Sequence, residues 1–518
     1  MKKKLCGLLF TALLTMAVLG GCADGTGESS GDKSSAEPVY GGSAVVGIQQ
    51  DIDSLDPHKA TAAGTKEILF NIFEGLVKSD ENGNLIGAVA SDYTLSEDGL
   101  VYTFTLREIV KFHNGNVVTA EDVKYSLERV SGLLDGTALI STLSADKGGI
   151  TSVDILDEKT VQVTVGSANT ELIYSFVAAI IPAGSGEEEG ADPVGTGPFS
   201  FVSYTPQVGI MVEKNPDYWQ EGLPYLDEVN FKIVGSAETA LMELQGGTID
   251  IYPYLTDSQA QALESGNTHR VIASPSNVVQ ALFLNNAAEP MDNALVRQAI
   301  LYALDKDQIN VFVGGGTGTL IGSAMLPTLA DYYEDLNDVY GIGANVEKAK
   351  ELLVDAGYPD GFDLVIDIPS NYEFHMQTGE VIVEQLKAVG INASINAVEW
   401  NTWLNDIYNG RQYTATISGV TCDQTPGYML NRFETTSSKN FINYSNAEYE
   451  EVYRKAQAAL DLNEKAGYYK QLQQLLVDDA ATAFIMVPGN MTAISNRLAG
   501  YKFYPIYVQD MSTVYVVQ

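Results

Sequence analysis

The sequence has few basic side chains for a chain of 518 residues. It contains 30 Lys and Arg residues against 67 Asp and Glu residues, which gives a formal net charge of −37. Nucleic acids and anionic lipid surfaces are bound through cationic faces, so this shortage argues against both as partners. The negative charge itself is of the kind that keeps an exported protein soluble.

Cysteine is also scarce, because the chain has only Cys6, Cys22 and Cys422. We expect no disulfide, since the first two cysteines fall in the N-terminal export segment described below. A chain of this length can bury ample apolar surface without such cross-links.

Motifs for catalysis and for metal binding are missing as well. The glycine-rich stretch at 311–322 has no lysine to bind a phosphate, and we expect it to be a flexible loop after a helix that ends near Ile309. Residues 195–199 lack the third glycine of a dinucleotide fingerprint. Neither an HExxH motif nor a Cys/His cluster is formed by the four histidines, His58, His113, His269 and His375. We therefore expect no cofactor, no metal and no enzymatic activity. A hydrolase with paired carboxylates is the alternative, and it predicts turnover of a substrate.

The N-terminus has the pattern of a bacterial export signal. Three lysines precede an apolar run from Leu5 to Leu19, which is too short to span a bilayer comfortably. The run ends in LGGC, which resembles the lipobox of bacterial lipoproteins, where cleavage precedes a cysteine that carries lipid. We expect a signal peptide at 1–21 and, at 22–40, lipidated Cys22 and a flexible tether. A plain secretory signal is the alternative, and no later stretch is apolar enough for a membrane helix.

A strand, a turn and a helix are predicted in close succession after residue 100. The residues from Val101 to Leu106 alternate with a period of two, which predicts a strand. An Asn-Gly turn follows. Thr119 is then a suitable N-cap, with Asp122 three residues later, and apolar residues recur at helical spacing from Val123 to Val130. On pattern alone, this combination occurs in any α/β protein.

Nine short strings, three of them in this segment, together point to a known family. In chain order the strings are DSLDPH, NIFEGLV, YTFTLRE, KFHNG, TAEDVKYSLERV, PVGTGPFSF, EKNPDYW, VRQAILYALDKDQI and EKAKELLVDAGYPDGF. Together they resemble the family 5 extracellular solute-binding proteins, the peptide and related-ligand receptors of ATP-binding-cassette (ABC) importers. The resemblance runs from about residue 43 to the C-terminus. It implies a two-lobed α/β fold of the periplasmic-binding-protein (Venus flytrap) type, with an extra subdomain in the first lobe.

The resemblance also implies how the chain divides. We expect lobe I at 41–79, 191–275 and 488–518, its subdomain at 80–190, and lobe II at 276–487. Local patterns within lobe II predict helices at 346–356, 379–389 and 400–408, and strands at 362–368, 391–397 and 413–418. Their alternation predicts a mostly parallel sheet with helices on both faces.

Ligands of such sheets bind beyond the carboxyl ends of the strands, which directs attention to Val420, Thr421, Cys422 and Asp423. In peptide-binding members of the family, an aspartate just past this strand pairs with the α-ammonium of the ligand, and Asp423 falls at the matching place. A charge-assisted hydrogen bond of this kind contributes about 1.5–3 kcal/mol. Capping of the local backbone is the alternative role for this aspartate.

Other candidate contacts come from both lobes. Trp400 matches a tryptophan that lines the pocket of oligopeptide binders, and Trp403 follows one helical turn later; each either stacks on a ligand or belongs to the core. In lobe I, the resemblance puts the segment with Thr61 and Ala63 at the cleft.

Two departures from the family pattern bear on the ligand. Members often have tryptophan where Val420 stands. Dipeptide binders also tend to carry an arginine that holds the peptide carboxylate, yet residues 370–380 contain none. A short peptide with a free C-terminus is therefore doubtful.

The sequence thus predicts a monomeric substrate-binding lipoprotein, anchored through Cys22 to the outer face of the bacterial cytoplasmic membrane. Its predicted role is to capture a peptide between two lobes and to deliver it to the permease subunits of an ABC importer. Another solute, such as an oligosaccharide stacked on Trp400 and Trp403, is an alternative within this class. An adhesin or signalling lipoprotein is an alternative outside it.

Overall fold

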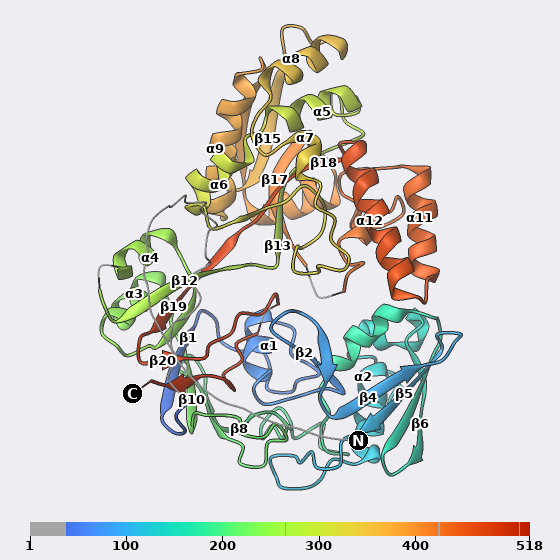
Figure 1. Cartoon of the computed structure of the whole chain (residues 1–518), viewed down its shortest axis with the longest axis vertical. Coiled ribbons are helices and arrows are strands. Elements are labelled where there is room, and N and C mark those ends of the chain that lie inside the picture. The colour runs from blue at the N-terminus through green and yellow to red at the C-terminus, as the bar shows by residue number, and fades with distance from the viewer. Residues whose placement is uncertain (1–37, 265, 423–424, 507, 518) are drawn as a thin grey trace, which may run out of the picture. The chain divides into compact units, whose positions relative to one another are not determined.

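The computed structural model describes residues 38–264, 266–422, 425–506 and 508–517. The expected signal peptide, Cys22 and Asp423 lie outside these described residues. Three larger sheets organise the described part of the chain, and we refer to the regions built on them as lobe I, the subdomain and lobe II (Figure 1).

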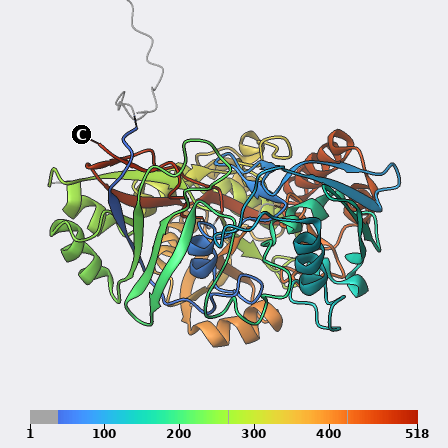
Figure 2. The same ribbon diagram turned by 90° about the horizontal axis from the view of Figure 1, so that it is seen from below.

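Lobe I is built on a seven-stranded sheet. Strands β1 and β10 pair in parallel, and β8 and β9 extend the sheet by antiparallel pairing (Figure 2). In spatial order its strands are β12 (His269–Pro275), β19 (Gly489–Ser495), β11 (Ile251–Leu255), β1 (Ser43–Ile48), β10 (Glu228–Ile233), β9 (Gly209–Lys214) and β8 (Phe199–Thr205). Helices α1 (Ala63–Leu69), α3 (Ala237–Gln245) and α4 (Asp257–Glu264) complete this lobe.

The subdomain is a four-stranded antiparallel sheet covered by one helix, α2 (Ala120–Ser131). Its strands are, in spatial order, β4 (Ala90–Leu95), β5 (Val101–Leu106), β7 (Thr160–Val165) and β6 (Ile150–Asp157). The strand and the helix predicted here from local pattern are both present. Thr119 caps α2 in a full capping box with Asp122, because each side chain accepts the other residue's backbone N–H.

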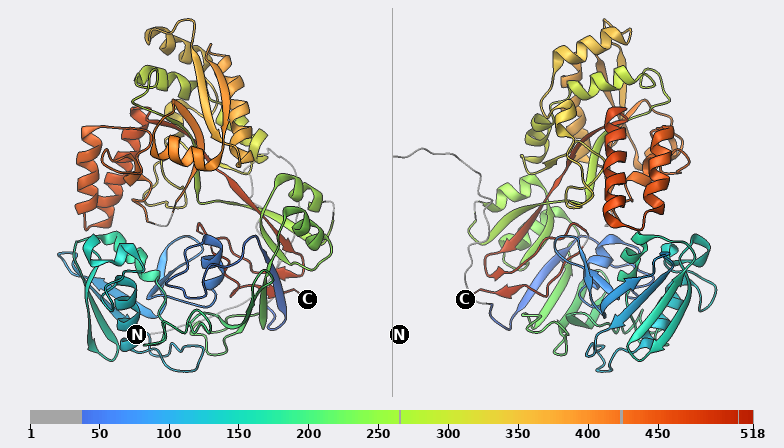
Figure 3. Two further views of the ribbon diagram at one scale, coloured as in Figure 1. Left: turned by 180° about the vertical axis from the view of Figure 1, so that it is seen from behind. Right: turned by 45° about the vertical axis from the view of Figure 1, so that its right-hand side comes forward.

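Lobe II contains a six-stranded sheet and most of the helices. Its strands are, in spatial order, β14 (Thr319–Leu320), β18 (Thr482–Val487), β13 (Val278–Leu284), β17 (Ala415–Thr421), β15 (Asp363–Pro369) and β16 (Asn392–Val398). Helices α11 and α12 pack on each other (Figure 3). The helices are α5 (Ala294–Ala303), α6 (Lys306–Gly314), α7 (Asn337–Tyr340), α8 (Val346–Asp355), α9 (Glu373–Lys387), α10 (Trp400–Thr402), α11 (Ala447–Ala458) and α12 (Leu462–Asp478).

Short elements fill the connections between these parts. Two-stranded sheets pair β2 (Val77–Ser79) with β3 (Leu85–Gly87), and β20 (Leu498–Ala499) with β21 (Tyr515–Val516). A 3₁₀ helix, η3 (Thr170–Val177), belongs to the subdomain, and a π-helix, η4 (Trp403–Asn409), continues α10. Among the described residues, no helix is long and apolar enough to cross a membrane.

Three expectations for lobe II were wrong in detail. The sheet is not mostly parallel, because only β15–β16 and β15–β17 pair in parallel, whereas β13 runs antiparallel to both β17 and β18. Helix α9 begins at Glu373 rather than at 379, and its start carries no side-chain cap that a sequence pattern would reveal. Helix α6 continues to Gly314, so the loop expected after residue 309 begins later.

The chain passes between the two lobes at two neighbouring crossings. One joins β12 to β13 through 276–277, and the other joins β18 to β19 at Pro488. The Ser276 N–H donates to the Pro488 carbonyl oxygen at 2.9 Å, so the crossings are bonded to each other.

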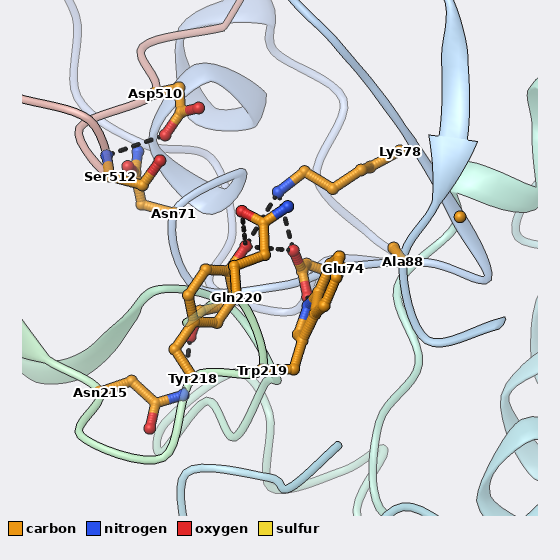
Figure 4. A network of polar contacts seen from close by, with 12 residues as sticks. Asn71, Glu74, Lys78, Ala88, Asn215, Tyr218, Trp219, Gln220, Asp510 and Ser512 are labelled. Atoms are coloured by element: carbon orange, nitrogen blue, oxygen red, sulfur yellow. Dashed lines mark hydrogen bonds and ion pairs between the residues drawn. The ribbon is translucent and has the colours of Figure 1, made fainter. Parts of the chain in front are cut away.

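A buried polar network ties the subdomain side of lobe I to the β9–β10 connection (Figure 4). The Glu74 carboxylate, 3% exposed, accepts hydrogen bonds from Lys78 Nζ at 2.8 Å, from the Tyr218 hydroxyl at 2.8 Å and from Trp219 Nε1 at 2.7 Å. Asp510, from the C-terminal segment, accepts from the Tyr504 hydroxyl at 2.6 Å. Buried carboxylates need such partners; at Glu74 they come from residue 78 and from 218–219, and at Asp510 from the C-terminal segment.

Candidate ligand-binding site

The carboxyl ends of three parallel strands lie together at one edge of the lobe II sheet. The β15–β16 register runs from Asp363↔Asn392 to Pro369↔Val398, and β17 pairs in parallel with β15 on the other side. The segments that leave these strands therefore emerge side by side, at the edge where open α/β sheets bind ligands. We call this edge the lobe II site edge; it comprises residues 370–375, 399–403 and 419–422.

Aromatic side chains cover the lobe II site edge. Tyr372, which is 42% exposed, meets Trp400 edge-to-face with ring centres 5.3 Å apart. Trp400 is half-buried and stacks on Trp403 at 5.3 Å, with the two ring planes only 7° apart. Tyr372 and Trp400 together offer an amphipathic surface of the kind that binds planar or apolar ligand groups.

Trp403 is enclosed in the core of lobe II. It is 4% exposed, and its Nε1–H donates to Thr416 Oγ1 at 3.0 Å. Phe441 and Tyr408 also lie against its ring. Of the two readings of its helical spacing, the core position is the one that the structure has, and the ring supports Trp400 from behind.

The end of β17 is fastened to the first crossing between the lobes. The Cys422 N–H donates to the Asn277 carbonyl oxygen at 2.7 Å, and the Asn277 side-chain amide donates back to the Cys422 carbonyl at 3.1 Å. Val420 and Cys422 are buried, with exposed fractions of 7% and 4%, whereas Thr421 is exposed. Thr421 is thus the described side chain here that is open to a ligand, and Asp423 follows two positions later.

His375 is a further member of the lobe II site edge, and the sequence analysis did not single it out. It is 8% exposed, and burial lowers its pKa to about 4, so the ring is neutral at physiological pH. The Gln280 amide nitrogen lies 2.9 Å from Nδ1, which therefore accepts and leaves the proton on Nε2. A Cβ at Gly419 would lie 3.2 Å from Cε1 of this ring and 2.5 Å from Val278 Cγ1, so only glycine fits beneath it.

The position of Tyr372 and His375 after β15 was a signal available in the sequence. Both residues follow the strand predicted at 362–368, at the end where such sheets bind ligands. The early start of α9 is what brings His375 onto the first turn of that helix.

On lobe I, the predicted segment at Thr61 and Ala63 is shaped by one carboxylate. Asp53 Oδ2 accepts from the Thr61 hydroxyl at 2.6 Å, from the Thr61 N–H at 2.8 Å and from the Ala62 N–H at 2.9 Å. Burial raises the pKa of Asp53, but these hydrogen bonds outweigh it and the net pKa is lowered. Thr61 and Ala63 are exposed, in a loop that the ionised Asp53 holds in place.

A small hollow lies at the crossings between the lobes. It is lined by residues of 253–254, 274–277, 490–492 and 501–509. These lining residues are aromatic, aliphatic, hydroxyl or amide side chains, and none carries a charge. Asn277 belongs both to this lining and to the bonded pair that fixes Cys422, so the hollow adjoins the lobe II site edge.

The described residues contain no group of three His, Cys, Asp or Glu side chains placed to hold a metal ion. The chemistry of the lobe II site edge and of the hollow is that of stacking and of hydrogen bonding.

Comparison with known proteins gives consistent results. The sequence pattern of one family, "Bacterial extracellular solute-binding proteins, family 5 Middle", matches residues 84–441. The glutathione-binding protein GsiB of Pectobacterium atrosepticum is 28% identical over 91% of this chain and 93% of its own.

Two solved structures are similar in fold. The ABC transporter substrate-binding protein CtaP of Listeria monocytogenes superposes with a TM-score of 0.82 at 23% identity, over 92% of this chain and 100% of CtaP. The periplasmic binding protein DppA of Helicobacter pylori, solved with the peptide STSA, gives 0.71 at 25% identity, over 93% of this chain and 99% of DppA. The two-lobed fold class expected from the sequence is thereby confirmed.

Proposed function

Because this chain belongs to the bacterial extracellular solute-binding proteins of family 5, we propose that it captures peptides between its lobes and delivers them to the permease of an ABC importer. Membership of the family makes it a substrate-binding protein of an importer, in a family of solute-binding proteins rather than enzymes. The choice of peptides and the delivery step are our proposals.

The observation that carries the proposal is the joining of the aromatic lobe II site edge to an uncharged, amide-lined hollow. Peptide groups need both donors and acceptors, and the Asn490 side chain in the lining of the hollow carries both. The rings of Tyr372 and Trp400 offer surfaces on which ligand side chains of varied chemistry can pack. Relatives support this ligand class, since DppA was solved with a peptide and GsiB is named for glutathione.

We assign the ligand's ammonium group to Asp423. The hollow offers no carboxylate among its lining residues, so a positively charged N-terminus needs an acidic partner from outside it. Asp423 comes directly after Cys422, whose backbone is held at the crossing by Asn277. A carboxylate at this point is able to make a charge-assisted bond with an ammonium group seated at the hollow.

The side chains of the site also argue against binding of a ligand carboxylate. No arginine occurs in 370–380, and the hollow has no lysine or arginine in its lining. We therefore propose that the C-terminus of the ligand extends beyond these described parts of the site, as in a longer peptide, or is blocked.

In the proposed cycle, a ligand that touches both lobes shifts the population toward the form that holds it, and the permease recognises that form. We further propose that the mature protein is a monomer that begins at lipidated Cys22 and is held at the outer face of the cytoplasmic membrane. Loss of membrane association in a Cys22→Ser variant expressed in a bacterial host tests the anchor.

Mass spectrometry of what the purified protein releases on denaturation tests the ligand class. The protein should begin after Cys22 and be purified without dialysis against denaturant. Recovered peptides support the proposal, and their lengths report whether long or blocked ligands are preferred. Recovered oligosaccharides would instead mean that Trp400 and Tyr372 stack on sugar rings.

Calorimetry on the recovered peptide tests the ammonium contact. Asp423→Ala should weaken binding by an order of magnitude or more, because it removes about 1.5–3 kcal/mol of charge-assisted bonding. N-acetylation of the peptide should weaken binding to the parent protein and have little further effect on the variant. Equal affinity of parent and variant would remove Asp423 from the site.

A further inference from the structure

One carboxylate of the subdomain bonds to two separate segments of lobe II. Glu171, on η3, receives the Gly427 N–H at 3.0 Å and the Tyr469 hydroxyl at 2.6 Å, and both donors meet the same oxygen, Oε1. Gly427 lies in the loop that follows β17, and Tyr469 lies on α12. The side chain of Asn169 accepts from the Glu171 N–H at 3.0 Å and so fixes the start of η3.

The packing around this carboxylate admits only glycine at residue 427. A Cβ there would lie 2.6 Å from the Tyr469 hydroxyl oxygen and 2.9 Å from Glu171 Oε2. Real Cβ atoms do not approach oxygen so closely, so a side chain would separate Glu171 from Tyr469. The backbone at Gly427 therefore packs directly against the Glu171 carboxylate.

A buried cation independently indicates that negative charge is required here. Lys465 lies one helical turn before Tyr469 on α12 and is 1% exposed. Among the described residues its Nζ has no hydrogen-bond partner, and it lies 6.0 Å from the centre of the Tyr469 ring. Burial lowers the pKa of Lys465, and the charge of Glu171 opposes that effect. An ammonium group without hydrogen bonds is costly to bury, so a nearby carboxylate has a clear stabilising role.

Described residues on both sides of 423–424 are bonded to other parts of the chain. Cys422 is bonded to Asn277 at the crossing, and Gly427 is bonded to Glu171 of the subdomain. Asp423 falls between these two attachments. We propose that Glu171 is a positioning residue for ligand binding: it holds Gly427, four positions after Asp423, and α12 against the subdomain, with Lys465 balancing its charge. The part of this inference that concerns Asp423 rests on the proposed function, whereas the bridge between the lobes does not.

The bridge is tested without any ligand by pulsed electron resonance between spin labels on the two lobes. Labels at Glu97→Cys and Glu384→Cys use exposed positions of the subdomain and of α9, and Cys422 is buried. Glu171→Ala should shift the distance distribution toward longer values. Glu171→Gln should leave it close to the parent's, because a single amide oxygen is able to accept both hydrogen bonds. Glu158→Gln, an equal charge change at an exposed turn of the subdomain, is the matched control.

Hydrogen exchange on the same variants reports on the loop. In Glu171→Ala, exchange of peptides that contain residues 425–428 should accelerate, and in Glu158→Gln it should not. A lower melting temperature in Glu171→Ala with unchanged distances and unchanged loop exchange would reduce Glu171 to a stabilising residue and overturn the inference.

The role of Lys465 is tested in the Glu171→Gln background. There the ammonium group has lost its balancing charge, so adding Lys465→Met should raise the melting temperature above that of Glu171→Gln alone. In the parent background the same substitution should lower it. Additive effects of the two substitutions would refute the charge balance.

These outcomes separate the bridge from the proposed function. Peptides released on denaturation together with unchanged distances would leave the function standing and remove the bridge. A distance shift in a protein that releases no peptide would keep the bridge and remove only its connection to Asp423.

Discussion

Replacing Lys78 by methionine should destabilise lobe I by about 3 kcal/mol. Lys78 and Glu74 form an ion pair at 2.8 Å in which both side chains are less than a tenth exposed (Figure 4). Removing one partner of a buried pair costs about 3–5 kcal/mol, because the other charge is left buried. The lower value is expected here, since Tyr218 and Trp219 still donate to the Glu74 carboxylate after the substitution.

Chemical denaturation followed by circular dichroism measures this loss as a change in the free energy of unfolding. The matched control is Lys111→Met, which breaks an ion pair with Asp217 whose side chains are 38% and 50% exposed. An exposed pair contributes about 0–1 kcal/mol, so the control should change little. A loss in Lys78→Met no larger than that in Lys111→Met would refute the reasoning.

The double variant Glu74→Gln/Lys78→Met separates charge from packing. It removes both charges and fills nearly the same volume, but it keeps one oxygen for the Tyr218 hydroxyl and none for the Trp219 Nε1–H, so it should recover only part of the loss. Burial lowers the pKa of Lys78, but Glu74 and Asp510 outweigh burial and raise it. A raised lysine pKa means that the contribution is fully present below the unfolded pKa and is lost only as pH rises through the folded value. The effect of Lys78→Met should therefore be constant across neutral pH.

Two other substitutions have definite expected outcomes. Burial lowers the pKa of His58, His113 and His375 to about 4, so their stabilisation is present above about pH 6.5 and is lost as pH falls toward 4. In His113→Gln the free energy of unfolding, measured by denaturation at each pH, should fall less steeply between about pH 6.5 and 4 than in the parent. An unchanged slope would show that His113 does not contribute to this loss of stability. Gly419→Ala should cost about 1–3 kcal/mol by overpacking against Val278, whereas Gly467→Ala, with open space around it on α12, should be neutral or stabilising. Thermal unfolding of the pair decides this, and equal melting temperatures would show that the site edge relaxes around the methyl group.

Local sequence patterns predicted elements whose signals lie within a few residues of one another. Strand β5 alternates over its own six residues, and the capping box of α2 spans Thr119 to Asp122. Helix α8 begins after an asparagine cap at Asn345 in the same way. These features depend on backbone geometry that neighbouring residues determine.

The direction of the lobe II strands could not be predicted from local sequence patterns. Strands β13 and β18 carry the chain into and out of lobe II, and this connection places them antiparallel to their neighbours. Alternation of helices and strands between residues 346 and 421 is compatible with the parallel part of the sheet alone. The rest depends on how the chain crosses between lobes, which no local period encodes.

Glu74 and Glu171 show why candidate site residues were harder to find than elements. Glu74 receives donors from residues 144 and 145 positions later, and Glu171 from a hydroxyl 298 positions later. In the sequence each is one acidic residue among 67, with no local pattern that distinguishes it. What distinguishes them is that the fold brings donors from distant segments to each carboxylate, which offsets the cost of withdrawing its charge from water. Donors at Glu74 join segments within lobe I, whereas those at Glu171 belong to the other lobe, so only the bonds of Glu171 are broken when the lobes separate.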